Sequence, residues 1–156
     1  MDERDFMRRA IALSRQGMEA GRGGPFGAVV VAGGRIVGEG VNQVTSTNDP
    51  TAHAEVVAIR AASAALGRFD LSDCEIYASC EPCPMCLSAV YWARIRRVYY
   101  GNGRADAARI GFDDAAIYTE VARPVEERSL PMVQMLSGEA RAAFEDWDRK
   151  PDKVRY

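Results

Sequence analysis

Long hydrophobic runs are missing from this sequence, since the longest, such as Ala28 to Ala32, fall far short of the ~20 residues that a membrane-spanning helix needs. An excess of either charge is also missing, because 20 Lys and Arg stand against 22 Asp and Glu, for a formal net charge of -2. A basic face for nucleic acid is therefore not expected. The opening segment, MDERDFMRR, is too charged for a secretion signal. We expect a cytoplasmic protein with neither a membrane nor a nucleic-acid partner.

Disulfide bonds are not expected either, although the sequence has four cysteines. Cys74, Cys80, Cys83 and Cys86 lie within thirteen positions, and the last three are spaced at intervals of three. Cysteines this close together make a poor disulfide framework. The spacing favours metal or thiolate chemistry instead.

The remaining composition is that of an ordinary globular protein. Of the 156 residues, 47% are hydrophobic and 27% are charged, and the 14 glycines and 7 prolines are scattered along the chain. A chain of this length can bury roughly two-thirds of its unfolded surface and needs no disulfide to form a core. No repeat or linker is visible, so we expect residues 1–156 to form a single domain with an irregular tail over 149–156.

Hydrophobic periodicity and turn signals place the secondary structure. We expect helices over 5–20, 50–66, 84–93 and 138–147, strands over 26–32, 35–44, 74–79, 96–101 and 131–136, and short helical turns within 105–123. The Gly33-Gly34 pair predicts a hairpin between the first two strands. The strand, helix, strand order over 74–101 predicts a right-handed crossover with parallel pairing. Alternating helices and strands indicate an α/β fold with helices on both faces of the sheet.

The start of the second helix has its own local signal. The Asn48-Asp49-Pro50 sequence offers a capping side chain followed by a proline, which is favoured at the first helical position. The Ala-rich segment that follows ends at Gly67. We therefore expect this helix to begin at about residue 50.

The single histidine of the sequence, His53, lies near the start of that helix. Cys83 precedes Pro84 and is expected at a helix N-cap, with Cys86 one turn further along, so both sulfurs would point at one spot. A helix N-terminus favours thiolates, which bind Zn²⁺. His53, Cys83 and Cys86 supply three ligands, which leaves the fourth position of a tetrahedral Zn²⁺ site to water or hydroxide.

Water activated in this way needs a proton acceptor, and Glu55 follows His53 by two positions. At that spacing the two side chains emerge about 200° apart around a helix, which is poor for joint chelation. The position suits contact with the water instead. The alternative is a core histidine, an exposed glutamate and a redox C-x-x-C pair with no shared role. Each of these explains either the His53 and Glu55 segment or the Cys83 and Cys86 segment, but not both.

His-x-Glu followed by Pro-Cys-x-x-Cys is the signature of zinc nucleobase deaminases. With GGPFGAVVV, NDPTAHAEVVAIR, SCEPCPMCLSAVYWAR, GFDD and the last tyrosine, the sequence resembles the bacterial guanine deaminases of the cytidine deaminase superfamily over its whole length. The resemblance implies a three-layer α/β/α fold around a mixed five-stranded sheet, one catalytic Zn²⁺ per subunit and a homodimer. It also implies that His53, Cys83 and Cys86 are the metal ligands and Glu55 the proton shuttle.

The substrate site is less directly marked. Asn42 can offer both a donor and an acceptor to a base, or can simply form a turn. Phe26 and Trp92 would sandwich a purine ring, unless they are core residues. We also assign Ala54 to this site. The resemblance further implies that the segment ending at Tyr156 closes over the site and is exchanged between subunits, although such tails usually fray.

The Gly111-Phe112-Asp113-Asp114 segment helps to distinguish a guanine deaminase from other deaminases with the same metal signature. The resemblance implies that its Asp114 delivers protons to the departing amine of guanine. Asp113 is expected instead to cap the short helix that follows. Cys80 and Cys74 are expected to be small buried side chains rather than ligands.

The function expected from these residues is hydrolytic deamination of guanine to xanthine and ammonia. One alternative is deamination of guanosine or another aminated heterocycle, of the cytosine or adenine type, at the same site. The other is a zinc-stabilised binding module without catalysis, which the presence of Glu55 disfavours. From Arg141 to Tyr156 the chain has five basic and four acidic residues, which is a poor pattern for a tail that binds phosphate.

Overall fold

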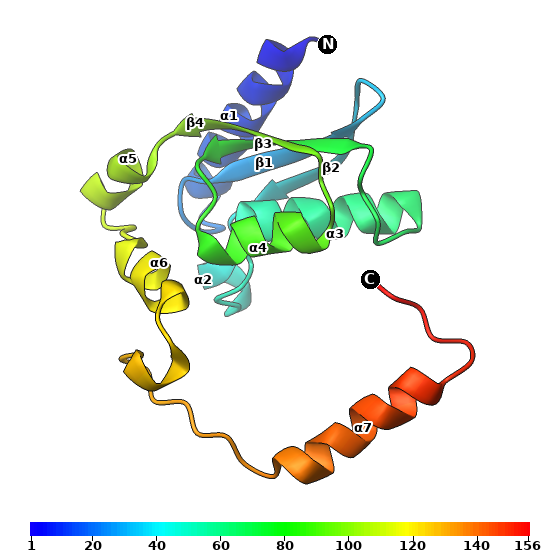
Figure 1. Ribbon diagram of the computed structural model, residues 1–156. Helices are drawn as coiled ribbons and strands as arrows, with labels where there is room; N and C mark the ends of the chain where they lie inside the picture. Colours follow the sequence, from blue (N-terminus) through cyan, green and yellow to red (C-terminus); the bar gives the residue numbers. More distant parts are fainter. The chain divides into compact units, whose positions relative to one another are not determined.

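A four-stranded mixed sheet in the order β2-β1-β3-β4 organises residues 1–114 of the computed structural model, which describes all of residues 1–156 (Figure 1). β1 runs antiparallel to β2 and to β3, whereas β3 and β4 are parallel. The strands are β1 (Gly27–Ala32), β2 (Arg35–Val41), β3 (Cys74–Cys80) and β4 (Arg97–Asn102). The predicted hairpin is confirmed, with Gly33 and Gly34 both at positive φ as its tight turn requires. The parallel crossover is also confirmed.

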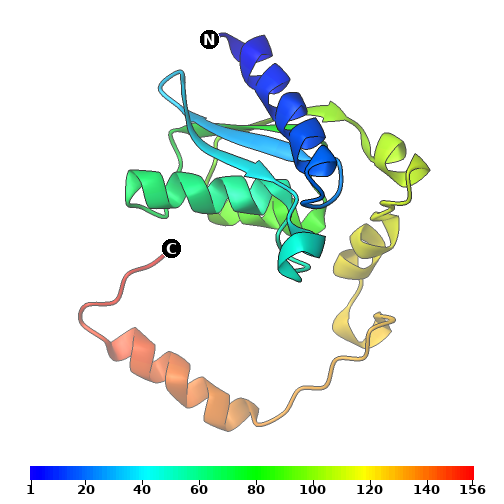
Figure 2. The same ribbon diagram turned by 180° about the vertical axis from the view of Figure 1, so that it is seen from behind.

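Helices cover both faces of this sheet, as the sequence predicted. α1 (Glu3–Glu19) packs on one face, and α3 (Ala54–Leu66) and α4 (Pro84–Trp92) on the other (Figures 1 and 2). The side chains of β1 alternate between two cores. Val29 and Val31 pack with Phe6 and Leu13 of α1, while Val30 packs with the alanines of α3. The strand is therefore buried on both sides.

The chain divides into two compact units, Met1–Asp114 and Ala115–Tyr156, and the expectation of a single domain stays a prediction. The first unit also contains two short helices, α2 (Val44–Thr47) and α5 (Arg104–Arg109). The second contains α6 (Ala115–Ala122), the short 3-10 helix η1 (Val125–Glu127) and α7 (Ser137–Arg149). No helix in residues 1–156 combines the length and the apolar character that crossing a membrane requires.

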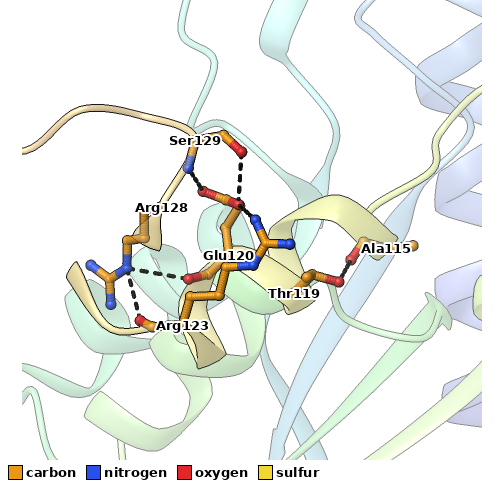
Figure 3. Close-up of polar contacts among 6 residues, drawn as sticks. All are labelled: Ala115, Thr119, Glu120, Arg123, Arg128 and Ser129. Atoms are coloured by element: carbon orange, nitrogen blue, oxygen red, sulfur yellow. Dashed lines mark hydrogen bonds and ion pairs between the residues drawn. The ribbon is translucent and has the colours of Figure 1, made fainter. Parts of the chain in front are cut away.

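In the second unit, one glutamate ties the end of α6 to the segment after η1. The carboxylate of Glu120 accepts hydrogen bonds from the backbone N–H of Ser129 at 2.7 Å and from Arg123 at 2.8 Å (Figure 3). Arg128 donates from Nε to the carbonyl oxygens of Glu120 and Arg123. These contacts satisfy carbonyls that the end of a helix leaves without partners.

The sheet has four strands rather than five, and the strand predicted over 131–136 is wrong. No residue of that segment pairs with another strand, and Leu136 has a left-handed backbone (φ 52°) at the N-cap of α7. A short apolar run indicates which residues avoid water, but it carries no information about a partner strand. The fold class itself is confirmed as α/β with a mixed sheet and helices.

The start of the second predicted helix also differs from expectation, because α3 begins at Ala54 and not near residue 50. Asn48 adopts a left-handed backbone and ends α2, while the Asp49 carboxylate accepts the backbone N–H of Thr51 at 2.8 Å. The Asn-Asp-Pro sequence therefore forms a turn, which these residue types favour as readily as a cap. As a result His53 occupies the N-cap of α3.

α3 lies unusually close to the sheet, because β2 presents glycines to it. A Cβ atom added at Gly40 would lie 2.6 Å from the backbone nitrogen of Ala58, and one added at Gly38 would lie 2.6 Å from that of Ala62. The opposing helix residues are alanines, so backbone approaches backbone. This contact fixes the distance of α3, and hence of His53, from the sheet.

Replacing Gly40 with alanine should lower the thermal midpoint by about 3 to 10 °C, because overpacking against a backbone costs about 1–3 kcal/mol. The matched control is Gly138→Ala in α7, where an added Cβ meets no atom within 4 Å. That control should leave the midpoint unchanged or raise it. Equal midpoints for Gly40→Ala and the original chain in a calorimetric scan would contradict the close approach.

Candidate active site

The candidate site residues of the first unit gather at one edge of the sheet, except for Trp92, which lies at the far end of α4. Strand register places the start of β1, the end of β2 and the carboxyl ends of β3 and β4 side by side at this edge. His53 and Cys83 are the N-caps of α3 and α4, the helices that cover the adjoining face. In an open α/β sheet, ligands bind outside the carboxyl ends of parallel strands.

The metal-ligand atoms meet at this edge without any disulfide. The Nδ1 atom of His53 lies 3.6 Å from the sulfur of Cys83 and 3.5 Å from the sulfur of Cys86, and all three ligand atoms lie within 4.8 Å of one another. All four cysteines of the chain are free thiols. As predicted, Cys83 is the N-cap of α4 and Pro84 its first residue, which places Cys86 one turn into the helix.

Electrostatics at this cluster favour a thiolate. The pKa of Cys83 falls to about 4, first because the thiol of Cys86 donates a hydrogen bond to it and then because His53 does. The pKa of Cys86 rises, because its proton is held by Cys83 and because it is buried. The Cys83 hydrogen bond also raises the pKa of His53. Two sulfurs and an imidazole form the soft, three-membered donor set that suits Zn²⁺ with one position open.

Glu55 is buried beside this cluster, in the first turn of α3, with 8% of its surface exposed. Burial is the largest cause of its raised pKa, and the negative charge of Cys83 adds to the rise. The angle of about 200° expected between His53 and Glu55 does not apply, because His53 precedes the helix and has an extended backbone. The chain turn at the N-cap lets both side chains approach one location.

Asn42 follows β2 and is buried, with 7% of its surface exposed. Its Oδ1 accepts the backbone N–H of Val44 at 3.1 Å and that of Gly24 at 3.3 Å. The acceptor half of the amide is therefore used by the protein itself, contrary to the expectation that Asn42 offers both donor and acceptor. Only the Nδ2 hydrogens remain to contact a base.

The aromatic candidates occupy different surroundings. Phe26 directly precedes β1, and its ring meets the ring of Phe112 edge to face at a centroid distance of 4.9 Å. Trp92 ends α4 with 65% of its surface exposed, and Tyr156 in the second unit is 73% exposed. Ala54, the first residue of α3, is fully buried. Roles of these four residues in substrate binding stay predictions.

Asp114 ends the first unit and forms an ion pair with Arg104, whose Nε lies 3.4 Å from Oδ1 of Asp114. The Asp114 side chain is 17% exposed. α6 begins at Ala115, directly after Asp114, and the cap expected from Asp113 stays a prediction. Sequence reasoning overlooked Arg104, because no local pattern signals an ion pair between residues ten positions apart.

The other two cysteines lie apart from the metal cluster. Cys74 and Cys80 are the first and last residues of β3, and both are buried, as predicted. Burial raises the pKa of each thiol to about 11. Sequence reasoning also overlooked Ser79, whose Oγ accepts the backbone N–H of Gly27 at 3.0 Å and ties β1 to β3 at the site edge.

Comparison with known protein families identifies this arrangement. Residues 1–102 match the family described as the cytidine and deoxycytidylate deaminase zinc-binding region. The matched region contains His53, Cys83 and Cys86. Over all 156 residues the chain is 51% identical to the guanine deaminase of Bacillus subtilis strain 168, and it covers 100% of that protein.

Solved structures give the same relationship. An X-ray structure of guanine deaminase from Bacillus subtilis matches 100% of this chain and 99% of its own, with a TM-score of 0.96. The structure of guanine deaminase from Nitrosomonas europaea matches with a TM-score of 0.70 at 34% identity, over 73% of this chain and 66% of its own. The tRNA-specific adenosine deaminase of Agrobacterium fabrum is 44% identical over 96 residues, which are 62% of each chain.

Proposed function

The chain belongs to the cytidine and deoxycytidylate deaminase family, and from that premise we propose that it hydrolyses guanine to xanthine and ammonia. The observation that carries the proposal is the convergence of His53, Cys83 and Cys86 beside a buried glutamate. Three ligands leave a coordination position open, which is the arrangement of catalytic rather than structural zinc sites. A zinc ion bound there would make water acidic enough to ionise near neutral pH.

Glu55 is the group we propose for proton transfer at the ring. Its carboxylate takes a proton from water and delivers it to a ring nitrogen of guanine, so it must bind the proton reversibly. Burial raises the pKa of Glu55 above that of an ordinary carboxyl group, so Glu55 holds a transferred proton more firmly than an exposed glutamate does. A non-catalytic binding module would have no use for this acid in a buried position.

Asp114 is the second group we propose for proton transfer. It takes the second proton of the attacking water, from the new hydroxyl at C2, and delivers it to the amino group of guanine, which leaves as ammonia. Two carboxylates then divide the two proton transfers of the reaction.

For substrate binding we propose Asn42, Phe26, Ala54, Trp92 and Tyr156. The Nδ2 hydrogens of Asn42 would bind an acceptor on the edge of the base, since its Oδ1 is held by backbone N–H groups. Phe26, which directly precedes β1, would stack on the purine. Guanine is favoured over a tRNA substrate because likeness to the guanine deaminase spans the whole chain, whereas likeness to the tRNA-specific adenosine deaminase spans 62% of it.

The direct test is ammonia release by the zinc-loaded protein from guanine, guanosine, adenine and cytosine. We expect guanine to be the preferred base and xanthine to be its product. Faster release from guanosine would move the function to nucleosides, because the site would then have to accommodate ribose. Release from none of the four would contradict the proposed function.

We further propose a cytoplasmic homodimer in which the segment from Lys153 to Tyr156 closes over the substrate of the partner subunit. Within the second unit this segment is held by contacts with the end of α7. Lys153 donates to Asp148 at 2.9 Å, and both Lys153 and Arg155 lie over the ring of Trp147. A segment held in place can exclude water from a site at small entropic cost.

Removal of residues 153–156 should lower guanine turnover by about tenfold or more while the thermal midpoint and zinc content change little. The control is Lys153→Gln, which keeps the length of the segment and removes its charged contact with Asp148. Turnover, metal content and calorimetric midpoint are measured together. Unchanged turnover would contradict closure over the substrate. A large fall in the thermal midpoint would mean that the segment stabilises the fold instead.

A further inference from the structure

Arg104 lies at the edge of the sheet that holds the metal cluster. Arg104 is the first residue of α5 and follows the carboxyl end of β4 by two positions. The backbone there is fixed, because Gly103 donates its N–H to Asp106 at 2.8 Å. Directly after the neighbouring strand β3, Glu81 donates its backbone N–H to the carbonyl oxygen of Asn102 at 2.8 Å. The start of α5 is thus joined to the segment that leads into Cys83.

The end of α5 turns the chain back toward its start. Gly111 donates its N–H to the carbonyl oxygen of Ala108 at 3.1 Å, and Phe112 donates to that of Ala107 at 3.0 Å. These two bonds form a Schellman motif, in which the residue at the position of Gly111 needs a positive φ, and its φ is 95°. The Phe112 ring then packs against Phe26, which anchors the returning segment.

Asp114 therefore arrives opposite Arg104, although the two residues are ten positions apart. Most ion pairs of this chain join well-exposed partners, such as Arg109 and Asp106, at 72% and 43% exposure. The Asp114 carboxylate is only 17% exposed, and Nε of Arg104 lies 3.4 Å from its Oδ1. A pair of this kind restricts the rotation of the carboxylate and keeps it from turning to solvent.

We propose that Arg104 is a positioning residue that orients the Asp114 carboxylate toward the departing amine of the substrate. This inference rests on the proposed function, because it takes from it the role of Asp114 in delivering protons. Arg104 holds the carboxylate in one orientation through its contact with Oδ1. A group transferring protons must be held within a fraction of an ångström, so the loss of such a contact reduces kcat more than it weakens substrate binding.

The experiment is a kinetic double-mutant cycle on the full-length, zinc-loaded protein with Arg104→Gln, Asp114→Asn and the combined variant. We expect Arg104→Gln to lower kcat by about 10- to 100-fold and to change KM by less than about twofold. In the Asp114→Asn background the same change should lower kcat by less than about twofold, because the group it positions is gone. Arg104→Lys keeps the charge and should recover most of kcat.

Arg109→Gln is the matched control, since it removes an arginine from the other end of α5 and should leave kcat unchanged. Equal loss of kcat in both backgrounds would contradict positioning through Asp114, and a rise in KM that persists without Asp114 would make Arg104 a substrate contact. If the two single substitutions shift the thermal midpoint by amounts that add up to the shift of the combined variant, Arg104 and Asp114 do not interact and the ion pair is contradicted. If the original chain releases ammonia from another base but not from guanine, the proposed substrate fails and the cycle is measured on that base.

Discussion

Replacing Cys86 with alanine should remove zinc from the protein, with metal content falling from about one ion per chain to near zero. Deamination should fall by about 10³-fold or more, because the several kcal/mol that the metal contributes to charge stabilisation are lost with it. Cys86 is fully buried, and its sulfur lies 3.5 Å from Nδ1 of His53. Elemental analysis of the purified protein, together with ammonia release from guanine, measures both effects.

Cys74→Ala separates the loss of a ligand from the loss of a buried sulfur. Cys74 is also fully buried, but it lies at the beginning of β3, outside the metal cluster. Both substitutions remove the same atom from a packed interior, so both should lower the thermal midpoint. Only Cys86→Ala should lose zinc. Full zinc content in Cys86→Ala, or an equal loss in Cys74→Ala, would overturn the ligand assignment.

Replacing Glu55 with glutamine should lower turnover by about 10² to 10⁴-fold and leave zinc content at one per chain. The amide keeps the size of the side chain but does not bind and release a proton near neutral pH. The structure supports the separation of these two effects, because Glu55 lies beside His53, Cys83 and Cys86 but is not a member of the cluster of ligand atoms. Kinetics and elemental analysis on the same preparation measure both.

The control for this variant is Glu75→Gln, which changes a partly buried glutamate at the beginning of β3 that pairs with Arg96 at 3.0 Å. It should keep normal turnover. Loss of zinc in Glu55→Gln would make Glu55 a metal ligand. Turnover close to that of the original chain would remove Glu55 from the mechanism.

Elements with a strong local signal were predictable from the sequence. α4 begins where expected because a proline at the first helical position allows few alternatives, and the Gly33-Gly34 pair marks the hairpin because its turn needs positive φ at both residues. The metal cluster was predictable for the same reason, since Cys83 and Cys86 are placed by one helix start. Their meeting with His53 was predicted from ligand chemistry and from the paired motifs rather than from local structure, because 30 positions separate His53 from Cys83.

Where local signals had two physical meanings, the sequence did not decide between them. Asn48, Asp49 and Pro50 suit both a helix start and a turn, and tertiary packing selected the turn and moved the helix start to Ala54. The segment over 131–136 is apolar, but pairing in a sheet depends on a partner strand, which no local pattern reveals. The ion pair between Arg104 and Asp114 was also not predictable from local sequence, because it depends on how the chain turns at the end of α5.

The close contact between β2 and α3 divides the protein into parts that tolerate change differently. Because Gly38, Gly40 and the alanines of α3 meet without rotatable side chains, no rotamer change can absorb an added atom there. Directed evolution toward another aminated base should therefore find almost no accepted substitutions along this contact. Accepted substitutions should concentrate outside this contact, at positions such as Phe112, which meets Phe26 through its ring, so that His53 stays in place.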